Sequence, residues 1–90
     1  MSDLQARFAQ AQEDVNHLAA RPDNKTLLKL YALYKQATQG DAAGEPPSGF
    51  DLVRRAKFDA WNAMKGATAE DSMRQYVDLV ASLGRNQSGH

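Results

Sequence analysis

The apolar residues of this chain recur at spacings of three and four in four separate stretches, and this periodicity constrains its fold more than any other feature. Such spacing places apolar side chains on one face of an α-helix, whereas a half-buried strand alternates at every second residue. No stretch of the sequence alternates in that way. We therefore predict an all-α protein of four helices without a sheet.

Helix-ending residues between the periodic stretches predict where each helix starts and stops. Pro22 lacks a backbone donor, and Gly40, Gly66 and Gly84 tolerate the left-handed conformation that is common after a helix end. Thr68 is a suitable N-cap, because its hydroxyl can accept from the amide three residues on. The predicted helices are residues 4–19, 26–39, 50–65 and 69–83, joined by a turn at 21–24 and a long loop at 40–49.

Size, charge and cysteine content limit the class of protein. The 90 residues, 42% of them hydrophobic, are enough for one small domain, residues 1–90, with an ordered core of about residues 4–84 and a frayed polar tail. A net charge of zero argues against a general nucleic-acid binder. Because the chain has no cysteine and no apolar run of roughly 20 residues, we expect a cytoplasmic protein without stable membrane insertion.

Patterns that would indicate catalysis or metal binding are weak. Glu13 and His17 share a helix face, but no third ligand follows at a suitable spacing, so an ordinary surface pair is favoured. The neighbouring acids Glu70 and Asp71 diverge by about 100° on a helix and cannot act as an acid–base pair. The glycine-rich loop lacks the Gly-Lys-Ser/Thr ending of a phosphate-binding loop. We predict no enzymatic activity, no cofactor and no metal.

A group of aromatic and cationic side chains lies in the basic middle of the chain, where residues 24–66 carry seven basic against four acidic residues. Its members are Tyr31, Tyr34, Lys35, Lys57, Trp61 and the later Tyr76. In one interpretation the rings are core residues and the lysines are solvated. In the other, a tyrosine ring stacks on a purine base while lysines neutralise its phosphates. The residues alone leave both interpretations open.

Two motifs in this region carry a family resemblance. Residues 30–41 read LYALYKQATQGD and residues 56–62 read AKFDAWN, followed by Lys65 and Gly66. With EDSMRQYV at residues 70–77, these runs closely resemble the acyl-CoA-binding protein family, in order and over nearly the whole chain. The resemblance implies a small up-down four-helix bundle with its ligand in a bowl on one side.

The resemblance also implies roles for individual residues. Tyr31 would donate to the 3′-phosphate of coenzyme A, and Lys35 and Lys57 would pair with that phosphate. Tyr34 would contact the adenine and Tyr76 the nucleotide end of the ligand, whereas Trp61 would be mainly a core residue. The residues expected to line the acyl-chain groove, with the first helix as another wall, are Leu27, Leu28 and Leu30.

The function implied is non-catalytic binding and intracellular carriage of medium- to long-chain acyl-CoA esters by a monomer, with transient contact to acyl-CoA-using enzymes or membranes. Two positions depart from the family pattern. Asn16 stands where relatives commonly have a lysine, and Gln12 where they have a small residue, so a phosphate contact from the first helix is in question. The alternative function is a helical protein-interaction module with no acyl-CoA ligand.

Overall fold

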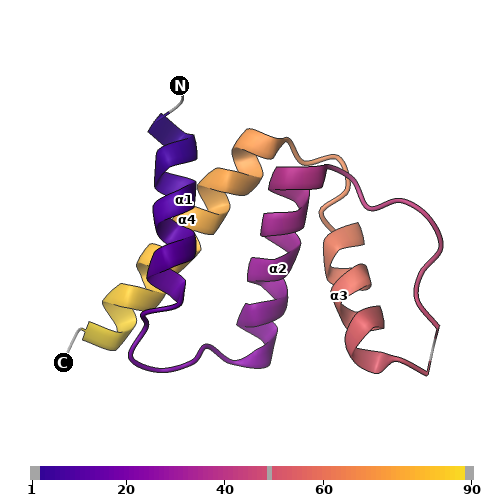
Figure 1. The fold of residues 1–90 in the computed structure, drawn as a ribbon, viewed down its shortest axis with the longest axis horizontal. Coiled ribbons are helices and arrows are strands. Elements are labelled where there is room, and N and C mark those ends of the chain that lie inside the picture. Colours follow the sequence, from indigo (N-terminus) through magenta and orange to yellow (C-terminus); the bar gives the residue numbers. More distant parts are fainter. Residues whose placement is uncertain (1–2, 49, 89–90) are drawn as a thin grey trace.

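A computed structural model describes residues 3–48 and 50–88 of the chain. Its elements are α1 (Asp3–Val15), α2 (Asn24–Gln39), α3 (Leu52–Asn62) and α4 (Ala69–Ser88). No strand occurs within these two ranges, so the predicted all-α, four-helix class is confirmed (Figure 1).

The helices form a flat molecule, with extents of 42 × 32 × 16 Å. α4 packs between α1 and α2, and α3 packs against α2 but against no other helix of the described chain. Figure 1 shows that α2 and α3 run in the same direction, so the strict alternation of an up-down bundle does not extend to this pair. The long segment between them must return along the full length of α2 before α3 can begin.

The core lies between α1, α2 and α4. Its buried members are Phe8, Ala11, Leu30, Leu33, Ala37, Tyr76 and Val80. None of the residues of α3 is buried. Because burial of apolar area supplies most of the folding free energy, α3 is the helix that the apolar core holds least strongly.

Short polar side chains cap three of the helices. Asp23 accepts from the backbone N–H of Thr26 at 2.8 Å, and Asp51 accepts from that of Arg54 at 3.1 Å. The predicted cap at the start of α4 is confirmed, since the hydroxyl of Thr68 accepts from the Asp71 N–H at 3.0 Å. Each cap satisfies a donor that has no partner in the first helical turn.

Two predicted helices are shorter in the structure. α1 ends at Val15 instead of residue 19, because the N–H groups of Asn16 and His17 bond to carbonyls three residues back, in a tighter turn. The side-chain nitrogens of both residues also lie within hydrogen-bonding distance of carbonyls of the last helical turn, at 3.2 and 2.8 Å. α3 covers residues 52–62 instead of 50–65, and residues 63–66 form a turn.

The predicted stop at Gly84 is wrong. Gly40 ends α2 with a φ of +81°, as expected, but Gly84 has no positive φ and lies within α4, which continues to Ser88. Glycine permits the left-handed conformation without requiring it, so its position alone does not end a helix. The frayed tail predicted for residues 85–90 is therefore helical up to Ser88, and residues 89–90 lie outside the described part.

Candidate functional site

The ring of Tyr31 on α2 lies near two ammonium groups from different helices. The Nζ atom of Lys35, one turn further along α2, is 6.0 Å from the ring centroid, and that of Lys57 on α3 is 5.3 Å away. Packing of α3 against α2 therefore brings together the three residues that the resemblance assigned to one phosphate. Each ammonium is within the range of a cation–π interaction with the ring.

Neither of these lysines has an acidic partner in the described part of the chain. The ion pairs found there all use arginine, between Arg7 and Asp3, Arg54 and Asp51, Arg55 and Asp59, and Arg74 and Asp71. Two cations held at one ring without a carboxylate produce a local positive potential, and an anion that carries several charges would relieve their mutual repulsion.

Tyr34 and Tyr76 form an aromatic group with Phe8 of α1. The Phe8 ring is stacked on Tyr34 at 6.1 Å and meets the edge of Tyr76 at 5.1 Å. Tyr34 is 40% exposed, which differs from a core position, whereas Tyr76 is buried in the core. Burial, and to a lesser degree Tyr34, raises the pKa of Tyr76 above its ordinary value, so its hydroxyl remains a proton donor at neutral pH.

Three hollows meet at Tyr31. The first, here called the Tyr76 hollow, has a volume of about 520 Å³ and is lined by Asn16, Arg21, Leu27, Tyr31, Tyr34 and Tyr76 among others. The second, the α2–α3 groove, has about 510 Å³ and is lined by Arg21, Leu27, Leu28, Leu52, Val53 and Lys57 as well as Tyr31. The third, the Trp61 hollow, has about 250 Å³ between Tyr31, Lys57, Trp61 and neighbouring residues.

The three leucines predicted for the acyl-chain groove do not share one surface. Leu27 lines both of the larger hollows, and Leu28 lines the α2–α3 groove. Leu30 is buried in the core. It borders the Tyr76 hollow but not the α2–α3 groove. The opposite wall of the groove consists of Leu52 and Val53, 76% and 66% exposed, which the sequence analysis did not assign. In the sequence, two adjacent apolar residues in the first turn of a helix are the feature that could have indicated this wall.

Trp61 is half-buried and outside the apolar core cluster, contrary to the core role that the resemblance implied. Its indole N–H donates to the Gly40 carbonyl at 2.8 Å, and its ring lies 4.9 Å from the Lys35 ammonium. The indole thus joins α3 to the end of α2 and faces one of the site's cations.

A polar cluster beside this contact fixes the end of α2 against the turn before α4. The Asp41 carboxylate accepts from the Gly66 N–H at 2.9 Å and from the Gln36 amide at 2.8 Å, and that amide also donates to the Ala67 carbonyl. These hydrogen bonds, from Gly66 first and then Gln36, lower the pKa of Asp41, and the charge of Lys65 adds to the effect.

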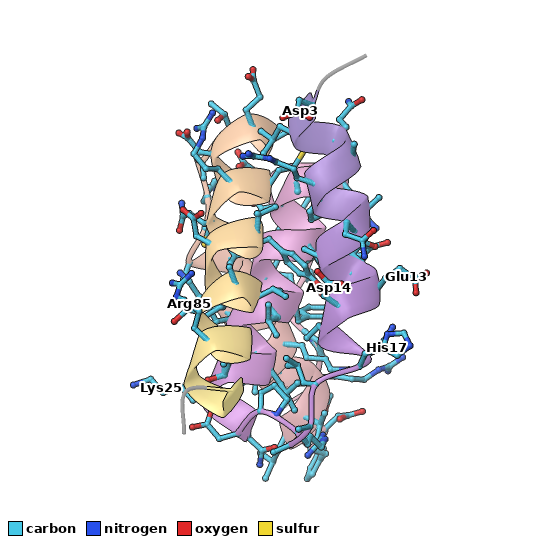
Figure 2. All side chains as sticks on the ribbon, turned by 90° about the vertical axis from the view of Figure 1, so that its left-hand side faces the viewer. Asp3, Glu13, Asp14, His17, Lys25 and Arg85 are labelled. Carbon is cyan, nitrogen blue, oxygen red and sulfur yellow. The ribbon has the colours of Figure 1, made fainter. Side chains whose placement is uncertain are left out.

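The first helix presents no cation to the site. Asn16 borders the Tyr76 hollow, and the Gln12 amide donates to the Phe8 carbonyl at 3.3 Å. Figure 2 shows Glu13 and His17 projecting away from the bundle. Among residues 3–48 and 50–88, no group of three or more potential metal ligands is present, and no helix has the length and apolarity that crossing a bilayer requires.

Comparison with protein families gives a match over most of the chain. A family model described as "Acyl CoA binding protein" matches residues 5–80. An acyl-CoA-binding protein homolog of Manduca sexta is 44% identical over 86 residues, which cover 90% of this chain and 96% of that protein. The enoyl-CoA delta isomerase 2 proteins of Rattus norvegicus and Homo sapiens are 46% and 47% identical over 83 residues. The chain spans only 21% of the length of each isomerase.

Solved structures show the same arrangement of helices. Acyl-CoA-binding protein 2 of Oryza sativa superposes with a TM-score of 0.89 at 38% identity, over 94% of this chain and 92% of that one. The corresponding protein of Moniliophthora perniciosa gives a TM-score of 0.88 at 30% identity, over 98% of this chain and 85% of that one.

Proposed function

The chain belongs to the acyl-CoA-binding protein family, and from this premise we propose that it binds medium- to long-chain acyl-CoA esters and carries them without chemical change. The observation that supports this function most directly is the pair of lysine ammonium groups beside Tyr31, which have no acidic partner in the described chain. A carrier must hold both a highly charged nucleotide head and an oily tail. The hollows that meet at Tyr31 offer surfaces of both kinds.

In this proposal the 3′-phosphate of coenzyme A lies against Tyr31, Lys35 and Lys57. The hydroxyl of Tyr31 makes no hydrogen bond to another residue of the described chain, so it is available to donate. Each hydrogen bond to a charged group contributes on the order of 1.5 to 3 kcal/mol. Because Lys35 is on α2 and Lys57 on α3, only the folded arrangement offers both at one phosphate.

The adenine occupies the Tyr76 hollow in the same proposal. Tyr34 is 40% exposed, and stacking of a base on an accessible aromatic ring is worth about 1 to 3 kcal/mol. Tyr76 borders the hollow from α4 and has a hydroxyl that is neither hydrogen-bonded to a described residue nor fully enclosed. It can therefore donate to the nucleotide end of the ligand.

The acyl chain follows the α2–α3 groove between Leu27 and Leu28 on one side and Leu52 and Val53 on the other. Shielding roughly ten methylenes at about 0.8 kcal/mol each gives about 8 kcal/mol before ordering costs. The protein should therefore prefer a long-chain ester to free coenzyme A. The head contacts should in turn favour the ester over the free fatty acid.

The Lys35 and Lys57 ammonium groups of this site face aromatic rings, an arrangement that supports binding of an anionic head. We propose that the carrier acts as a monomer in the cytoplasm, without a cofactor, and releases its ligand in transient contacts with acyl-CoA-using enzymes or membranes.

Calorimetric titration with palmitoyl-CoA, coenzyme A and palmitate tests the function. We expect tight binding of the ester and weaker binding of both fragments, together with thermal stabilisation by the ester alone. Lys57→Ala should weaken ester binding by about tenfold or more. The matched control is Lys25→Ala, because Figure 2 shows this lysine projecting away from the bundle and it borders none of the three hollows.

Absence of binding by the folded wild-type protein would contradict the carrier function. It would favour the alternative of a helical interaction module, in which exposed tyrosines and leucines receive a partner helix. Equal losses in Lys57→Ala and Lys25→Ala would show that net charge, and not the cluster at Tyr31, attracts the ligand.

A further inference from the structure

Arg21, in the turn between α1 and α2, borders both of the large hollows. It lines the Tyr76 hollow together with Asn16 and Tyr34, and the α2–α3 groove together with Lys57. Its side chain is exposed and forms no ion pair within the described chain. An arginine at the junction of two hollows, without an acidic partner, is a free cation beside the proposed ligand path.

The proposed ligand carries more negative charge than the pair of lysines can neutralise. A phosphate monoester such as the 3′-phosphate carries about two negative charges at neutral pH, which match the two ammonium groups beside Tyr31. Coenzyme A also has a diphosphate on the 5′ carbon of the same ribose, and its charge needs a further cation close by. The helix α1 supplies none, because its cation Arg7 borders none of the three hollows, and Asn16, just beyond its end, is an uncharged amide.

The other cations near the site are less suitable. Arg54 lines the Trp61 hollow, but its Nε lies 3.7 Å from the Asp51 carboxylate in an ion pair. Lys25 borders a separate hollow on the side of α2 that faces Met64 and Leu79. Of these three cations, only Arg21 lines both the Tyr76 hollow and the α2–α3 groove and lacks an acidic partner in the described chain.

We propose that the guanidinium of Arg21 binds the diphosphate of the coenzyme A head, as the third cation of the site. This inference rests on the proposed function. The planar guanidinium presents parallel N–H donors that match two phosphoryl oxygens, and its charge does not titrate in the physiological range. Arg21 thus sits where the nucleotide in one hollow continues into the acyl chain in the other.

The proposal assigns different phosphates to different cations, and a second ligand can separate them. Palmitoyl-3′-dephospho-CoA retains the diphosphate and the acyl chain but lacks the 3′-phosphate. Removal of Arg21 should weaken both esters by the same factor, about tenfold. Removal of Lys35 should weaken binding of palmitoyl-CoA far more than binding of the dephospho ester. The dephospho ester lacks the 3′-phosphate that Lys35 is proposed to bind.

The experiment is calorimetric titration of wild type, Arg21→Gln, Arg21→Lys, Lys35→Ala and Lys25→Gln with both esters, with helicity checked by circular dichroism. We expect an equal loss for both esters in Arg21→Gln, partial recovery in Arg21→Lys and wild-type affinity in Lys25→Gln. Because Arg21 makes no ion pair and no side-chain hydrogen bond within the described chain, its variants should fold normally.

Three results would overturn the assignment while leaving the carrier function intact. They are unchanged affinity in Arg21→Gln, a loss that disappears with the dephospho ester, and an equal loss in Lys25→Gln, which would indicate a long-range field. Failure of the wild-type protein to bind palmitoyl-CoA would overturn both proposals. If wild type bound only palmitoyl-CoA and not the dephospho ester, a diphosphate clamp would also be rejected, since it should preserve part of the affinity.

Discussion

The indole N–H of Trp61 donates a hydrogen bond to the carbonyl oxygen of Gly40 across 2.8 Å. Gly40 follows the last residue of α2, where carbonyl groups lack intrahelical partners, so the indole satisfies an acceptor that the helix itself leaves open. The same ring faces the Lys35 ammonium at 4.9 Å. One side chain of α3 therefore both fastens that helix to α2 and borders the proposed phosphate site.

Replacing this indole should separate its two roles. Trp61→Phe keeps an aromatic ring but removes the donor, and we expect the free energy of unfolding to fall by about 1 kcal/mol. Affinity for palmitoyl-CoA should change little, because the ring that faces Lys35 remains. Urea unfolding followed by circular dichroism measures the first effect and calorimetry the second. An unchanged urea midpoint would show that the bond to Gly40 adds no stability.

The hydroxyl of Tyr31 should matter for binding and not for folding. Tyr31→Phe keeps the ring beside the two ammonium groups and removes only the hydroxyl, which has no partner in the described chain. We expect palmitoyl-CoA to bind about tenfold more weakly, at unchanged helicity and thermal midpoint. Tyr34→Phe, one turn further along α2, is the matched control and should lose less, because the contact proposed for Tyr34 uses its ring and not its hydroxyl. Calorimetry showing wild-type affinity in Tyr31→Phe would refute its role as a phosphate donor.

The polar cluster at the end of α2 should make the free energy of unfolding depend on pH in the acid range. Hydrogen bonds from Gly66 and Gln36 hold the pKa of Asp41 below its ordinary value of 3.8. Since the folded-state pKa lies below the unfolded one, this contribution is fully present above pH 3.8 and is lost as the pH falls through the folded-state value.

The variant Asp41→Asn tests this dependence, because its side chain cannot gain a proton in the same range. We expect the urea midpoint of the variant to fall less than that of wild type when the pH drops from neutral to below 3.8. Some acid sensitivity should remain, since hydrogen bonds to Thr26 also lower the pKa of Asp23. Parallel pH profiles for wild type and variant would contradict the assignment.

Local signals in the sequence were enough to predict four helices, but not where each of them ends. The Thr68 cap depends on residues within one turn, and it was predicted correctly. Gly84 could not be interpreted from its identity, because glycine is compatible with both a helix and its end, and α4 continues through it. The early end of α1 depends on how Asn16 and His17 compete for carbonyls of the last turn, which periodicity does not report.

The candidate site was also predicted only in part. The resemblance supplied the residue types of the cluster, and the structure brings Lys35 and Lys57 to the Tyr31 ring. The resemblance did not indicate both walls of the α2–α3 groove, because the approach of Leu52 and Val53 to Leu27 depends on how α3 packs along α2. The place of Leu30 in the core depends instead on how α1 and α4 pack against α2.

Ligand binding should stabilise α3 more than any other helix. α3 has no buried residue and packs against α2 alone among the helices, so its local opening should cost less free energy than that of α1, α2 or α4. The proposed ligand would touch Lys57 and Leu52 on α3 as well as Tyr31 on α2. A state in which α3 has detached cannot make these contacts, so the ligand favours the docked state.

Amide hydrogen exchange with and without palmitoyl-CoA measures this difference. We expect amides of residues 52–62 to slow by about tenfold or more at saturating ester, and those of residues 3–15 to slow less. Palmitate at the same concentration should protect α3 weakly, because it lacks the head that binds Lys57. In Lys57→Ala the protection of α3 by the ester should shrink while that of α2 persists. Uniform protection of all four helices would show that the ligand stabilises the fold globally instead of bridging α2 and α3.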